Sequence, residues 1–203
     1  HLFRGEVALP AAVMINSLGV ILMLYSNAGI SAISSVPYAF SEVFTFLSLG
    51  TWTYIFQGLL VLSLMILRRK FVPSYLFSFV VGFVFGELLD LHRMWVGVLP
   101  DSLPWRIVWF LLSYVLISIG IAISNRCGLP IVPTDLFPRE LSDITQVGYP
   151  RIKIIFDVSI EGLGIGTIAA AFTMGKAVGI CGNFIDRHFR FETFLSRRKV
   201  TAE

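Results

Sequence analysis

Four long stretches of this chain carry almost no charge, and this feature limits the possible fold more than any other. Residues 8–26, 51–67, 72–86 and 105–123 contain a single charged side chain, Arg106. A run of about 20 apolar residues is long enough to cross a bilayer as a helix. Charged residues make up 14% of the chain, against about 25% in a typical soluble domain. The sequence therefore predicts an all-α polytopic membrane protein.

The basic residues orient the predicted helices, because Lys and Arg favour the cytoplasmic side of a membrane. Basic clusters occur at 68–70 and in the tail, 189–203. Six crossings place both clusters and both termini in the cytoplasm, whereas five would put the tail outside. The region 157–167 is short for a full hairpin, so either a span is broken there or the natural protein has residues that this sequence lacks. We predict spans at 8–26, 51–68, 72–92, 104–124, 151–165 and 166–186.

The two halves of the chain resemble each other. The segment "SLGVILMLYSNAGISAISS", from Ser17, is similar to "SIGIAISNRCGLPIVPTD", from Ser118. Gln57 and Asp157 then take matching places 100 residues apart (157 − 57). Each half holds three predicted spans, and an odd number inverts the second copy relative to the first. Inverted repeats are typical of many secondary transporters, although economy of folding alone would also explain the repetition.

A polar, proline-containing segment follows the first span of each half. "GISAISSVPYAFSEVF" and "GLPIVPTDLFPREL" are both too short and too broken to cross a bilayer. Each fits a short loop followed by an amphipathic half-helix that either re-enters the membrane or lies in its interface. We expect Ser34 or Ser35 to cap the first half-helix and Thr134 or Asp135 to cap the second. The predicted organisation is a first repeat at 8–92 with its half-helix segment at 30–48, a second repeat at 104–188 with its half-helix segment at 129–147, and a basic cytoplasmic tail at 189–203.

Ionisable residues inside the predicted spans are candidates for function, because a charge in the membrane is costly. Asp157 and Glu161 share one face of the fifth span, at i and i+4. Pairing "FVFGELL" with "FTMGKAV" matches Glu87 with Lys176; a rival pairing matches "GELLDLH" with "GNFIDRH". These groups predict either an internal salt bridge or a proton relay. The predicted site for a solute or ion consists of Ser34, Gln57, Glu87, Thr134, Asp135 and Asp157.

Enzyme chemistry finds little support in the sequence. The three His and two Cys residues show neither metal-ligand nor redox spacing, and no nucleophile elbow, phosphate loop or zinc-protease motif is present. "GLGIGT", Gly162 to Thr167, follows no strand, so its glycines suit close helix packing. No basic face with stacking aromatics indicates nucleic acid. We therefore predict neither an enzyme nor a cofactor or metal site.

The elements "GLPIVPTDLF", "IKIIFD", "GIGTIAAAF" and "FGELLDL" resemble those of the bacterial YczE/YitT-type integral membrane proteins. The resemblance runs from about residue 12 to 188. It implies a protein of the bacterial cytoplasmic membrane, commonly regarded as a transporter, with no settled substrate. In the first repeat, Ala32 and Ser34 stand where that family usually has Pro and Asp.

These features together predict a small transporter or channel for a small polar solute or ion, with its site between two inverted repeats in the lipid bilayer. A substrate-binding membrane subunit that needs a separate energising partner is one alternative. A structural or assembly protein without a ligand is another. The small-residue run "GTIAAA" fits packing within one chain or in a homodimer.

Overall fold

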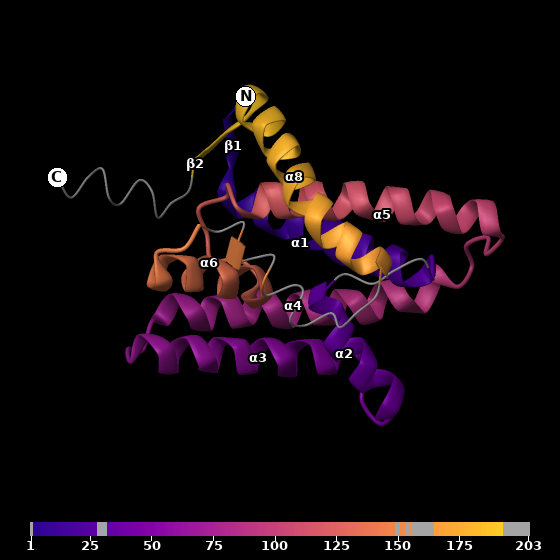
Figure 1. The fold of residues 1–203 in the computed structure, drawn as a ribbon, viewed down its shortest axis with the longest axis horizontal. Helices are drawn as coiled ribbons and strands as arrows, with labels where there is room; N and C mark the ends of the chain where they lie inside the picture. The colour runs from indigo at the N-terminus through magenta and orange to yellow at the C-terminus, as the bar shows by residue number, and fades with distance from the viewer. Residues whose placement is uncertain (1, 28–31, 149–150, 153–154, 156–164, 193–203) are drawn as a thin grey trace.

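The computed structural model describes residues 2–27, 32–148, 151–152, 155 and 165–192. Within them the chain is helical, apart from two short strands at its ends (Figure 1). The elements are β1 Leu2–Arg4, α1 Gly5–Tyr25, α2 Ala32–Val43, α3 Leu49–Arg68, α4 Pro73–Val96, α5 Leu103–Ser124, α6 Pro133–Thr145, α8 Ile165–His188 and β2 Arg190–Glu192.

Four helices, α1, α3, α4 and α5, are long and apolar enough to span a membrane, among the residues described. They confirm the four apolar helices predicted at 8–26, 51–68, 72–92 and 104–124. α4 runs on to Val96, four residues beyond its predicted end. The predicted fifth span, 151–165, lies almost wholly outside the described residues. The predicted sixth span, 166–186, falls within α8.

Two short helices occur where half-helices are predicted, α2 within 30–48 and α6 within 129–147. They lie toward opposite ends of the long helices (Figure 1). The expected caps are wrong: α6 begins at Pro133 after Val132, and α2 begins at Ala32. Pro suits the first position of a helix because its missing N–H has no intrahelical partner there, so Thr134 and Asp135 lie one and two residues inside the helix.

One end of the bundle, here called the basic end, holds the start of α1, the α3–α4 connection and the ends of α5 and α8. β1 pairs with β2 there in parallel, Leu2 opposite Arg190, so the first residues of the predicted tail form a strand. Arg126, just after α5, binds Asp186 of α8 through two contacts of 2.6 and 2.8 Å. Arg68, Arg69 and Lys70 also lie at this end.

The opposite end, here called the distal end, holds the ends of α1 and α4 and the starts of α3 and α5. The Tyr25 hydroxyl donates to the carbonyl of Leu99 in the α4–α5 connection, at 2.6 Å. Asp90, near the end of α4, accepts the backbone N–H of Gly50 at 2.9 Å, which satisfies a free donor in the first turn of α3. Asp90 thus binds a neighbouring helix.

α1 and α5 form the centre of the core, where each helix offers a glycine to the other. A β-carbon placed on Gly19 would lie 3.1 Å from the backbone N of Ile117, and one on Gly120 would lie 3.2 Å from the backbone N of Asn16. The two contacts are reciprocal, since Gly19 to Gly120 and Asn16 to Ile117 are both steps of 101 residues (120 − 19; 117 − 16). α1 also packs on α4 as α5 packs on α8.

Candidate functional site

The face of α4 that meets α3 includes a stripe of small residues. Ser78, Gly82 and Gly86 follow one another at i, i+4 and i+8, and all three are buried. A β-carbon on Gly86 would lie 2.8 Å from the carbonyl oxygen of Gly50 on α3. Small residues at this spacing let two helix backbones approach closely. Because these α4 residues are small, they also leave space between α3 and α4 that a side chain from another element can occupy.

Gln57 fills part of that room. It lies near the middle of α3, is fully buried, and directs its amide oxygen at the Cα face of Gly82. A β-carbon on Gly82 would clash with this oxygen and would lie 3.0 Å from Cδ of Pro133. Gly82 is therefore the point where three elements meet: the middle of α3, the middle of α4 and the first turn of α6.

Two side chains at this meeting point hold polar atoms without partners among the described residues. In the part of the chain that the structure describes, the Gln57 amide nitrogen and oxygen and the Ser78 hydroxyl are buried without a hydrogen bond. Each such group costs about 1–3 kcal/mol relative to a satisfied one. Buried polar groups are otherwise almost always bonded. The arrangement therefore suits groups that bond to something the protein acquires.

The first turn of α6 supplies the other side of this buried cluster. Thr134 and Asp135 are each 3% exposed. The chain reaches this turn through the buried residues Ile131 and Val132. The free N–H groups of a helix start give it a partial positive charge, so Asp135 adds a carboxylate where that potential favours it. The cluster combines an amide, two hydroxyls, a carboxylate and a helix start among apolar helices.

The far end of α6 is fixed at the basic end. Glu140 accepts from Arg68 at the end of α3, at 2.6 Å, and from the hydroxyl of Tyr75 at the start of α4. α6 therefore starts beside the middle of α3 and α4 and ends beside their termini. The preceding loop runs inward from the end of α5, and α6 runs back out (Figure 1). This is the path of a segment that enters a bundle and returns.

The structure brings together three of the residues predicted for the site and separates others. Gln57 meets the α6 turn that holds Thr134 and Asp135. Ser34 is buried in the other half-helix, α2. Glu87 lies on the exposed face of α4, and Lys176 is exposed on α8, so neither joins Gln57. Asp157 and Glu161 lie outside the described residues.

The two pairings proposed for the ends of the repeats both stay predictions. Gly86 and Gly182 are each closely approached by the preceding structure, by Gly50 in one case and Arg126 in the other. Four residues on, Asp90 and Asp186 each bind those same neighbours. Gly50 lies in the first turn of α3 and Arg126 follows α5, which are different places in the two predicted repeats. These contacts therefore do not decide between the pairing of Glu87 with Lys176 and the pairing of "GELLDLH" with "GNFIDRH".

Sequence reasoning missed Ser78, Gly82 and Asn16. Asn16 is buried between α1 and α5, and its amide oxygen lacks a partner among the described residues. The spacing of Ser78, Gly82 and Gly86 is visible in the sequence as a small-residue repeat. The sequence does not show what this repeat is for, because only the packed structure shows that Gln57 and Pro133 fill the space beside Gly82.

No group of three His, Cys, Asp or Glu side chains within the described residues is arranged to hold a metal ion. Cys127 is buried and Cys181 half-buried, and neither is in a disulfide. Burial raises the pKa of the Cys127 thiol. A buried thiol of raised pKa is a poor nucleophile, so Cys127 serves packing.

The fold and the buried cluster define the class of protein: a helical protein with four candidate membrane spans and a polar focus inside them. The chain belongs to a family of unknown function, DUF6198, whose family model matches residues 3–183. No curated protein and no solved structure matches it. The family match leaves the resemblance to the YczE/YitT-type proteins as a prediction.

Proposed function

We propose that this protein is a small transporter or channel for a small polar solute or ion, and that the solute binds at the buried polar cluster. One observation carries the proposal: within the part of the chain that the structure describes, Gln57 and Ser78 hold buried polar atoms without partners, beside the start of a half-helix. A bound solute would satisfy them. Irregular backbone at membrane depth persists only where protein or a water-filled cavity covers it, and the loop before α6 fits that description.

The internal repeat supports the same function. Reciprocal contacts between α1 and α5 are those of a twofold relation between the two halves. α2 and α6 lie toward opposite ends, as two inverted copies require. In inverted-repeat transporters the substrate site lies near the bilayer midplane, at broken helices. Gln57 lies eight residues after the start of the 20-residue helix α3 (57 − 49), and this central position supports a site at that depth.

We propose that the basic end faces the cytoplasm of a bacterial cell, with both termini inside. Arg68, Arg69, Lys70 and Arg126 all lie there, as the positive-inside rule requires. Single cysteines test this orientation in a background without the native thiols. Lys70→Cys should react with an impermeant reagent only after the membrane is opened, and Ser102→Cys in intact cells. The reverse pattern would invert the proposed orientation.

The chemistry of the site limits the solute. An amide both donates and accepts, and hydroxyls do the same, so the cluster suits a polar, compact molecule with several hydrogen-bonding groups. We propose no catalytic role, cofactor or metal. Any coupling proton would fall to Asp157 or Glu161, the predicted acids of the fifth span. A transporter without coupling needs neither.

The first experiment is a thermal-shift screen of the purified protein against small polar metabolites. A ligand at 100 times its Kd stabilises the native state by about 2.7 kcal/mol. We expect a hit that Ser78→Ala weakens. The matched control is Ser63→Ala on α3, whose exposed hydroxyl bonds its own helix at Leu59.

Flux in liposomes then decides the function. Movement of the hit by protein alone supports a transporter or channel. Binding without flux would indicate a capture subunit that needs a partner. A screen without hits, in a protein that melts cooperatively, would leave only a structural role and would refute the proposal.

A further inference from the structure

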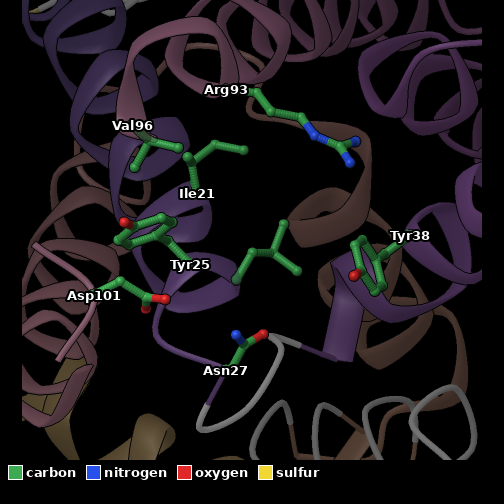
Figure 2. Close-up of a pocket in the computed structure, with 8 residues that line it drawn as sticks. Ile21, Tyr25, Asn27, Tyr38, Arg93, Val96 and Asp101 are labelled. Atoms are coloured by element: carbon green, nitrogen blue, oxygen red, sulfur yellow. The ribbon is translucent and has the colours of Figure 1, made fainter. Parts of the chain in front are cut away.

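A cavity with several polar side chains lies at the distal end, away from the buried cluster. The last turns of α1 and α4, helix α2 and the α4–α5 connection surround a space of about 210 Å³ (Figure 2). At about 30 Å³ per water, that volume suits a solute of only a few heavy atoms. Its lining residues are Ile21, Leu24, Tyr25, Asn27, Tyr38, Arg93, Val96 and Asp101.

Arg93 is the cation of this cavity. Its guanidinium points into the space, with Tyr38 on the same side and Asn27 below (Figure 2). Its one ion pair within the described residues, to Glu42, is long at 3.6 Å, and both side chains are about half exposed. Among the described residues Arg93 has no hydrogen bond within normal distance. Its fork of N–H donors is therefore free to bind an anion in two-point fashion.

The acid of the cavity is already engaged. Asp101 accepts two hydrogen bonds from Arg106, at 2.8 and 2.9 Å, and these hold the pKa of its carboxyl below the ordinary value. Tyr25 is likewise fixed, with its hydroxyl on Leu99. Asp101 therefore neither pairs with Arg93 nor leaves an uncompensated negative charge. The cation that faces the cavity, Arg93, is held only by its long pair with Glu42 among the described residues.

We propose that this cavity binds the carboxylate of a small organic solute through Arg93, with Tyr38, on the same side of the space, as an additional polar contact. A planar guanidinium matches a carboxylate in geometry. The solute would displace Glu42, itself a carboxylate held at long range. With one available cation and two acids nearby, the site suits a monoanion better than a dianion such as phosphate. Binding here does not depend on the proposed transport.

A cysteine in the cavity wall reports its charge. Leu24→Cys would be made with Cys127 and Cys181 replaced by Ala, and its modification rates compared for an anionic and a cationic methanethiosulfonate. Arg93→Gln should lower the ratio of the anionic to the cationic modification rate about tenfold. In water, one unit charge about 6 Å away attracts one probe and repels the other, and removing that charge changes their relative rates by about this factor. Arg187→Gln, an exposed cation at the basic end, is the control. Equal ratios with and without Arg93 would overturn the proposal.

Protection identifies the ligand class. Sodium acetate and glycine should slow the anionic reagent at least twofold at matched ionic strength, and methylammonium chloride should not. Arg93→Gln should abolish the protection, and Arg93→Lys should keep part of it. Stronger protection by phosphate than by acetate would refute a carboxylate site. As a second measurement, replacing chloride with acetate should raise the melting temperature of the unaltered chain and not that of Arg93→Gln. An equal effect of acetate on the two proteins would also count against the site.

Discussion

Replacing Gln57 with leucine separates a binding residue from a structural one. Leucine has a similar size and no polar atoms, so the substitution fills the same space beside Gly82. If the amide bonds nothing in the empty protein, its removal relieves a buried, unsatisfied group. The change should then stabilise the fold and remove the solute site, whereas most core substitutions destabilise.

The magnitude follows from the two unpartnered amide atoms of Gln57. Unsatisfied buried groups cost about 1–3 kcal/mol each, and part of that cost is already relieved by local adjustment. We expect Gln57→Leu to raise the free energy of unfolding by about 2 kcal/mol. By the scaling for chains of this length, that is an upward shift in melting temperature of about 4–8 °C.

The assay is thermal melting in detergent of the wild type, Gln57→Leu and Gln57→Ala, each with and without the best ligand from the screen. Gln57→Ala should melt lower than the leucine variant, because it leaves a cavity. The leucine variant should melt higher than wild type without ligand and show no ligand shift. If it melts as low as the alanine variant, the Gln57 amide is bonded within the folded protein and the reasoning fails. A full ligand shift in a stable Gln57→Leu would refute the binding site.

Three further predictions concern other parts of the structure. Gly82→Ala should lower stability by about 1–3 kcal/mol through overpacking, while Gly97→Ala, which meets nothing within 4 Å, should stay within about 0.5 kcal/mol of wild type; equal melting of the two would refute the close packing at the cluster. Glu140→Gln removes a charge 2.6 Å from its guanidinium partner, Arg68. It should lower the free energy of unfolding by about 1 kcal/mol and increase hydrogen exchange in α6, whereas Asp143→Asn, at an exposed acid of the same helix, should do neither. The pKa of Asp101 is depressed, so its pair contributes stability above the ordinary Asp pKa of about 3.9 and loses it as pH falls through the lower folded value; a carboxyl NMR titration that gives an ordinary pKa would contradict the pairing.

Prediction from the sequence succeeded where one physical rule dominates locally. Four apolar stretches became α1, α3, α4 and α5, because length and lack of charge suffice to specify such helices. Both half-helices were found from their polar, proline-containing sequences. Their first residues were not, since Pro133 competes with Thr134 and Asp135 for the start of α6, and proline needs no capped N–H.

The candidate site was predictable only in part. Gln57 was predicted from its position in the repeat, and Thr134 and Asp135 from the half-helix signal. The structure brings them together, and their binding of a solute stays a prediction. Glu87 was expected to join them, because it lies in an apolar helix, yet it is on the exposed face of α4. Distance along the chain gives the depth of a residue in a span. It does not give the direction in which its side chain points, because that depends on which helices pack on either side.

The sequence by itself determined the four long apolar helices and the two short proline-containing helices, since each depends on runs and spacings within a single segment. Only the tertiary structure decided that Gly82 is the meeting point of α3, α4 and α6, that Asp90 binds the start of α3, and that Arg93 faces a cavity. Each of these facts joins residues from different helices. Their relative placement follows from the packing of the whole bundle, where small residues set how closely the backbones approach and so which polar groups meet.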